Sequence, residues 1–263
     1  TLDGDVIIQS LSISGGTLNG DFDITLTGSL ACSGGTIAGI GDLIVNGATS
    51  LTTTYTSLFS RAVYINGGGS TTAAGRFYTH ANCTLHLPAG QTFTMNTIGY
   101  TPWNGWPNNC IFFVDGTLIK NGPEPAHFLY QTFVTNGHII INQGSIDWAN
   151  GGTHSGADIA INGSASYLGL GGGTHSFTNC TFSGTGSVPI YGNANVSTFT
   201  GNTWSNTLHL RMHAGSLTLG QDLIVPTYRH LGGTLNGTGN FIVLDSVQLT
   251  NGNIENNGSW NIG

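Results

Sequence analysis

Gly15-Gly16-Thr17-Leu18-Asn19-Gly20 is a hexapeptide that recurs letter for letter as Gly232-Gly233-Thr234-Leu235-Asn236-Gly237. A close variant is Gly34-Gly35-Thr36-Ile37-Ala38-Gly39. A second exact pair is Gly151-Gly152-Thr153-His154-Ser155 and Gly172-Gly173-Thr174-His175-Ser176. The hexapeptide at Gly15 and its variant at Gly34 are about 20 residues apart, and so are the two pentapeptides. This spacing is within the range of solenoid repeats. The period of the chain therefore decides the fold prediction.

An independent marker gives the same period. Val45-Asn46-Gly47 returns as Ile65-Asn66-Gly67, and Ile141-Asn142 returns as Ile161-Asn162. Both returns again span about 20 residues, one solenoid repeat. Between the turns, apolar and polar residues alternate, as in Phe22-Asp23-Ile24-Thr25-Leu26-Thr27. This alternation is typical of short strands with one buried face.

Two architectures fit short strands with frequent Gly-rich turns: a β-solenoid and a sandwich of many strands. Only the solenoid requires the same turn residues in each coil, because its coils stack about 4.8 Å apart. We therefore predict an all-β, single-stranded β-solenoid with coils of about 20 residues. We expect a right-handed parallel β-helix, following the general handedness of parallel crossovers. We expect one domain over residues 1–263, with an irregular, loop-bearing region at about 51–135.

Composition excludes several classes of function. The 263 residues include 42 Gly but only 5 Lys or Arg and 12 Asp or Glu, which gives a net charge of −7. We therefore expect no nucleic-acid partner, because such partners require a basic surface. No apolar run approaches the roughly 20 residues of a membrane span, so we expect no membrane insertion.

The Gly-Gly-Thr-Leu-x-Gly pattern with alternating short strands resembles the Gly/Thr/Asn-rich β-helical repeats of prokaryotic surface proteins, such as autotransporter passengers and filamentous-haemagglutinin-type adhesins. The resemblance covers about residues 10–50 and 150–263. It implies a secreted, extended right-handed β-helix and names no activity. It also places the chain outside the cell or at the cell surface.

The irregular region contains the densest aromatic segment of the chain. Thr101-Pro102-Trp103-Asn104-Gly105-Trp106-Pro107-Asn108-Asn109 is predicted as a loop projecting from the solenoid, because proline donates no ladder hydrogen bond. Its aromatic residues either contact a sugar or a partner protein, or fold back over the solenoid. The candidate ligand or partner contacts are Tyr100, Trp103, Trp106 and Trp148.

We predict no enzymatic activity and no cofactor. Glycoside hydrolysis normally requires two carboxylates about 5–9.5 Å apart. If the chain were a polysaccharide hydrolase or lyase, or a phage tailspike, the candidate catalytic residues would be Asp115, Asp147 and Asp158.

Cysteine and histidine spacing leaves further alternatives. Cys83 and Cys110 are separated by one coil plus a short insertion and are the best disulfide candidates. His154 and His175 occupy the same position of the repeated pentapeptide. They are expected to stack as a surface pair at a turn; no third metal ligand is apparent, and we predict no metal site.

Self-assembly is the function that the sequence favours. Low charge removes the repulsion that normally keeps protein surfaces apart. Neither end of the chain shows a charged cap, and open strand edges can pair with other copies. We predict an extracellular structural protein, a β-solenoid subunit of a fibre, tube, sheath or surface layer, with copies of itself as partners. The alternative is an adhesin or carbohydrate-binding β-helix, with glycans as partners.

Overall fold

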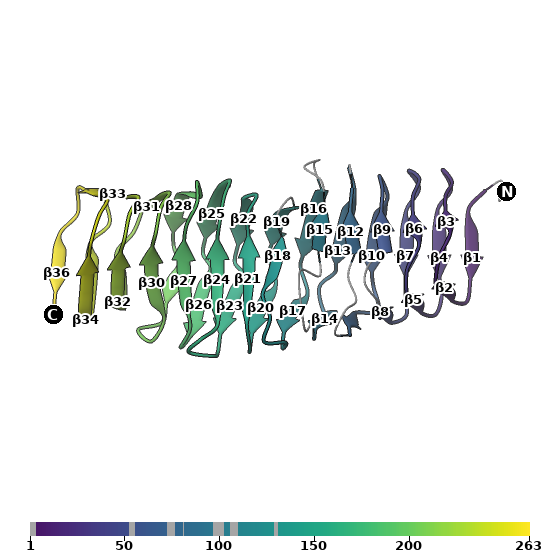
Figure 1. The fold of residues 1–263 in the computed structure, drawn as a ribbon, viewed down its shortest axis with the longest axis horizontal. Helices are drawn as coiled ribbons and strands as arrows, with labels where there is room; N and C mark the ends of the chain where they lie inside the picture. Colours follow the sequence, from purple (N-terminus) through teal and green to yellow (C-terminus); the bar gives the residue numbers. More distant parts are fainter. Residues whose placement is uncertain are drawn as a thin grey trace.

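The computed structural model describes residues 4–52, 56–72, 77–80, 82–96, 103–105, 110–128 and 131–263, and it places their strands in three long parallel sheets. The coils stack into a rod with the two ends of the chain at opposite ends (Figure 1). The described residues contain strands but no helix. The all-β solenoid prediction is confirmed, as is the coil length of about 20 residues.

The three sheets are named A, B and C here, and each coil contributes one strand to each sheet along most of the rod. Sheet A contains β1 (Val6–Ile8), β4 (Ile24–Leu26), β7 (Leu43–Val45), β10 (Ala62–Ile65), β13 (Thr84–Leu87), β16 (Cys110–Val114), β19 (Gln131–Thr135), β22 (Gly152–Ser155), β25 (Thr174–Thr178), β28 (Asn195–Thr200), β31 (Ser216–Leu219), β33 (Thr234–Gly237) and β35 (Asn253–Asn256). Sheet B contains β2 (Leu11–Ile13), β5 (Leu30–Cys32), β8 (Thr49–Leu51), β11 (Gly69–Thr71), β14 (Thr92–Met95), β17 (Thr117–Lys120), β20 (His138–Ile141), β23 (Asp158–Ile161), β26 (Thr181–Gly184) and β29 (Thr203–Trp204). Sheet C contains β3 (Thr17–Leu18), β6 (Thr36–Ile37), β9 (Thr56–Leu58), β12 (Phe77–Thr79), β15 (Trp103–Gly105), β18 (Ala126–Phe128), β21 (Ser145–Trp148), β24 (Tyr167–Leu170), β27 (Ser187–Ile190), β30 (His209–Met212), β32 (Leu223–His230), β34 (Phe241–Leu249) and β36 (Trp260–Ile262).

Alternation along each strand explains the core. In β16 the side chains of Cys110, Phe112 and Val114 are buried, while Ile111 and Phe113 between them are half-buried on the outer face. Stacking in register places inward residues over inward residues in the next coil, as Phe112 over Phe133. A continuous apolar column therefore fills the rod, and its burial is the main stabilising contribution.

Asparagine ladders mark one corner of the rod. Asn142 Nδ2 donates to Asn121 Oδ1 (2.8 Å), and Asn162 Nδ2 donates to Asn142 Oδ1 (2.8 Å). Asn66 Nδ2 likewise donates to Asn46 Oδ1 (3.0 Å). The Asn markers read from the sequence are therefore equivalent positions in neighbouring coils.

The hexapeptide is a turn motif rather than a coil marker. Thr17 and Thr36 are register partners in sheet C, as the spacing of the two motifs predicts. Thr234 of the identical copy begins β33 in sheet A instead. The same Gly-rich turn suits different corners of the rod because each corner makes a similar change of direction before a short strand.

One glycine of the motif allows a close approach between coils. Gly39 has φ of +109°, and a Cβ at this position would lie 1.9 Å from the carbonyl oxygen of Gly20 and 2.7 Å from Nη2 of Arg61. A side chain cannot occupy this space, so the last glycine of the variant motif makes room for the arginine.

The predicted loop at 101–109 requires a correction. Trp103–Gly105 forms β15, which pairs in parallel with Phe77–Thr79 of β12 and lies within sheet C. The prolines at 102 and 107 lie outside these three residues, so the rule against proline in central strands is not broken. The irregular region thus contributes strands to all three sheets.

Candidate functional site

Trp148 does not lie on the surface, contrary to the prediction that it contacts a ligand. Its side chain is 0% exposed and stacks on Phe133 and His154, with ring centroids 5.0 and 4.5 Å away. The last residue of β21 faces inward, so the indole belongs to the core. Of the other predicted contacts, Tyr100 and Trp106 lie outside the described residues, and Trp103 is described only in its backbone.

The predicted His154–His175 pair is also buried, not a surface pair at a turn. The two rings are 6.0 Å apart between centroids, and both side chains are 0% exposed. His154 is the register partner of Phe177, so the two histidines are offset by two positions. Burial lowers the pKa of both, to about 4 for His175, and both imidazoles are neutral at pH 7.

The three candidate carboxylates each pair with a histidine of the preceding coil, but they do not form a catalytic pair. Asp147 lies in sheet C, Asp158 begins β23 of sheet B, and Asp115 follows β16 of sheet A. His138 Nδ1 lies 3.1 Å from Asp158 Oδ2 on the surface of sheet B. The geometry therefore brings no two of these carboxylates together across one substrate site.

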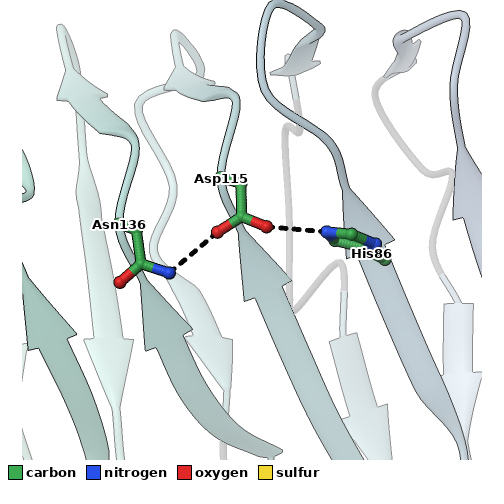
Figure 2. A network of polar contacts seen from close by, with 3 residues as sticks. All are labelled: His86, Asp115 and Asn136. Atoms are coloured by element: carbon green, nitrogen blue, oxygen red, sulfur yellow. Dashed lines mark hydrogen bonds and ion pairs between the residues drawn. The ribbon is translucent and has the colours of Figure 1, made fainter.

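Asp115 connects three coils on the outer face of sheet A (Figure 2). Its Oδ2 accepts a hydrogen bond from His86 Nε2 (2.8 Å), and its Oδ1 accepts one from Asn136 Nδ2 (2.9 Å). Partial burial would raise the pKa of Asp115, but the hydrogen bonds from His86 and Asn136 outweigh it, and the pKa is lowered. The ionised carboxylate thus holds the imidazole of His86 in one orientation.

His86 belongs to an apolar and aromatic row, here called the sheet A strip. The strip consists of the outward residues of five stacked strands: Ile44, Tyr64, His86, Phe113 and Val134, which are successive register partners. All five are half-buried. The rings of Tyr64 and Phe113 contact His86 edge to face, at centroid distances of 5.6 and 5.8 Å. The strip is therefore an ordered row of mostly apolar and aromatic side chains with no lysine or arginine.

Asp147 is the most deeply buried of the three carboxylates, at 1% exposure, although it lies on the outer side of sheet C. His127 Nδ1 lies 2.8 Å from its Oδ2, Tyr191 OH donates to its Oδ1, and Ser145 lies 3.5 Å away. Gly169 is its neighbour in the next strand, where any Cβ would meet the carboxylate and the Tyr191 hydroxyl. Three coils therefore cooperate to cover one carboxylate.

Sequence reasoning missed the sheet A strip and Tyr191. The signal was present, because Ile44 and Tyr64 are separated by one period, as are His127 and Asp147. Placing each residue on a coil of that length would have stacked these pairs. Only the structure shows which residues face outward after the insertions in the irregular region.

Cys83 and Cys110, the disulfide candidates, are neighbours in adjacent coils, and the structure has both as thiols. Thr84 and Ile111, the residues that follow the two cysteines, are register partners, and both buried cysteines are free. Both sulfurs point at the carbonyl oxygen of His80, which Cys83 Sγ reaches at 3.2 Å. The hydrogen bond with Cys110 and burial raise the pKa of the Cys83 thiol.

No group of three or more His, Cys, Asp or Glu side chains in the described part of the chain is arranged to hold a metal ion. The described residues also contain no helix that is long and apolar enough to cross a membrane. Comparison of the chain with protein-family models, with curated proteins and with solved structures gives no match.

Proposed function

We propose that the chain is an extracellular structural protein whose solenoids pack side by side through the sheet A strip. The observation that carries this proposal is the strip itself, outward apolar and aromatic side chains stacked in register over five coils. Burial of such a face against another sheet removes apolar area from water, at about 25 cal/mol per Å². Parallel sheets usually have both faces covered.

A second copy of the chain is the partner that the chemistry favours. The strip has no lysine or arginine, and the carboxylate of Asp115 beside it is bound by His86 and Asn136. Ile111 and Thr132 extend the neutral surface as register partners in the adjacent outward row. With 5 basic and 12 acidic side chains in 263 residues, little long-range repulsion opposes the approach of an identical rod. The neutral, Gly/Thr/Asn-rich composition supports an extracellular location.

Sedimentation velocity and negative-stain electron microscopy of the purified chain test the proposal. We expect concentration-dependent oligomers or ordered polymers, and we expect Val134→Lys to give monomers because it places a charge in the strip. Ile140→Lys is the matched control, since Ile140 is a half-buried outward aliphatic residue of sheet B in the same coil. A wild-type chain that stays monomeric at high concentration would refute the proposal. Equal assembly of Val134→Lys and wild type would refute it too.

A further inference from the structure

A second unusual surface lies on sheet C, well away from the residues of the sheet A strip. Outward positions of a solenoid tend to repeat, as the Asn121, Asn142 and Asn162 ladder does. The central outward row of sheet C changes chemistry at almost every coil instead. Along β18, β21, β24, β27, β30 and β32 the row is His127, Asp147, Gly169, Pro189, Arg211 and Arg229.

Two residues of this row, Pro189 and Arg211, line an open depression of about 250 Å³ in the face of sheet C. Its walls are Tyr167, Pro189, Tyr191, Arg211 and His213. Pro189 is buried and gives the depression an apolar floor, while both tyrosines are half-buried at its sides. Its volume lies just below the roughly 300–1,000 Å³ of pockets for drug-sized ligands, which suits a single small ring.

The orientation of Tyr191 is fixed from below. Its hydroxyl donates to Asp147, which in turn is held by His127 Nδ1 at 2.8 Å. Burial, the charge of Asp147 and this hydrogen bond raise the pKa of Tyr191, so the hydroxyl keeps its proton. The buried network thus fixes the position of Tyr191, so this lining residue gives the depression a rigid aromatic side.

Arg211, a lining residue of the depression, has a second cation as its neighbour in the next strand. Arg211 and Arg229 are register partners in parallel strands, an arrangement that places their Cα atoms about 4.8 Å apart. Like charges directly opposite in a sheet are destabilising. Arg229 Nε donates to Gln248 Oε1 (2.8 Å), whereas Arg211 has no hydrogen-bond or ion-pair partner among the described residues.

Among the described residues, the lysine and arginine side chains that reach the surface lie on this face. Arg61 and Lys120, the other cations in the described part of the chain, are each 0% exposed. Arg211 and Arg229, the accessible cations of the described residues, therefore lie next to each other. An anion between them would remove their repulsion, and guanidinium groups bind carboxylates and sulfates through two parallel hydrogen bonds.

We propose that the depression on sheet C binds an anionic sugar residue of an acidic polysaccharide. Tyr167 and Tyr191 contact the ring of the sugar, and Arg211 with Arg229 binds its carboxylate or sulfate group. A linear polysaccharide can continue along the row, since the row runs parallel to the rod. The site is too sparsely charged for nucleic acid, whose binding depends on many cations. This binding site is independent of assembly through the sheet A strip.

Isothermal titration calorimetry with defined oligosaccharides tests the site. The probes are oligogalacturonate as the carboxylate arm, heparin-derived oligosaccharides as the sulfate arm, and neutral cello-oligosaccharides as the uncharged comparison. We expect binding to at least one acidic probe, with no binding to the neutral one. The arm that binds identifies the anion.

Variants then assign the binding to the depression. We expect Arg211→Gln and Arg229→Gln each to weaken binding at least tenfold, with unchanged circular dichroism and thermal unfolding. His138→Gln, an exposed change on sheet B, is the control and should bind as wild type does. No binding of either acidic probe, or equal binding by wild type and both arginine variants, would overturn the proposal. Equal affinity for a single-stranded oligonucleotide or for anionic phospholipid vesicles would also overturn it, because it would show charge attraction without sugar recognition.

Discussion

Replacement of Arg61 by methionine should open the first coils of the solenoid while leaving the later ones intact. The guanidinium is 0% exposed at the corner before β10 and donates to four carbonyl oxygens of the two preceding coils. The acceptors are Ala38 at 3.0 Å, Phe22 at 3.2 Å, Asp42 at 3.2 Å and Gly20 at 2.6 Å. A single side chain therefore fastens three coils together.

The magnitude follows from those acceptors. Ile24 N also donates to the Asp42 carbonyl, but no backbone N–H of the described residues reaches the carbonyls of Gly20, Phe22 or Ala38. Each buried acceptor left unpaired costs about 1–3 kcal/mol. All three residues are half-buried, so water can reach them in part and the lower value applies. Three such carbonyls give a local destabilisation of about 3 kcal/mol.

Hydrogen exchange measured by mass spectrometry tests this expectation. In a solenoid each coil contacts only its neighbours, so the loss should remain local. About 3 kcal/mol corresponds to roughly a hundredfold larger opening equilibrium. Amides of residues 4–60 should therefore exchange about a hundredfold faster in Arg61→Met, while those beyond residue 131 should not change. Arg229→Met, which removes an exposed arginine, is the control. Unchanged exchange in residues 4–60, or uniform acceleration along the whole chain, would refute the reasoning.

Three further predictions follow from buried polar groups. Burial lowers the pKa of Lys120 from 10.5 to about 8. Between these two pH values the unfolded chain holds more protons than the folded chain, so the free energy of unfolding rises with pH, by up to about 3 kcal/mol. Denaturant titrations over this pH range should show that Lys120→Met lacks this rise. Both ring nitrogens of His154 are buried without a partner, so His154→Phe should raise the unfolding free energy by about 1 kcal/mol. The pKa values of His154 and His175 are lowered in the folded chain, so below about pH 6.5 the unfolded chain binds protons first, and the stability of the wild type should fall on acidification. A variant with phenylalanine at both positions should lose less stability over the same pH range. A thermal-shift series from about pH 7 to 4 checks this difference and the higher stability of His154→Phe. All four cysteines are free and buried, so a thiol reagent should count none in the native chain and four in guanidinium chloride, whereas a count of two would show a disulfide.

The period of the fold could be predicted from the sequence because some side chains bond to their own copies. Asn142 and Asn162 are both constrained by the ladder, so the asparagine recurs in consecutive coils and leaves a readable signal. Turn motifs were a less reliable guide, because the identical hexapeptides at Thr17 and Thr234 lead into different sheets. Turn chemistry is local, and three corners of one rod can share it.

The side of the sheet on which a residue lies could not be predicted for Trp148. A one-residue shift of register exchanges the buried and exposed faces of a strand, and Asp147-Trp148 can be read either way from sequence alone. The structure buries both: Trp148 joins the inward stack, and Asp147 is covered on the outer side by His127 and Tyr191. The surface contact that the sequence predicts for Trp148 is therefore wrong.

Departures from repetition are where a solenoid can encode a specific function. Each coil is stabilised by the same inward column and the same corner turns, so stability alone favours similar outward residues in successive coils. Against this background, a buried Asp147, a bare Gly169 and the adjacent Arg211 and Arg229 are costly or neutral for folding. Asp147 holds Tyr191 and Arg229 adjoins Arg211, and both Tyr191 and Arg211 line one depression, which gives these residues a common explanation that folding does not supply. The sheet A strip is the opposite case, a regular surface whose repetition suits contact with another regular surface. The two faces therefore point to two different partners, an identical rod on sheet A and a charged sugar on sheet C.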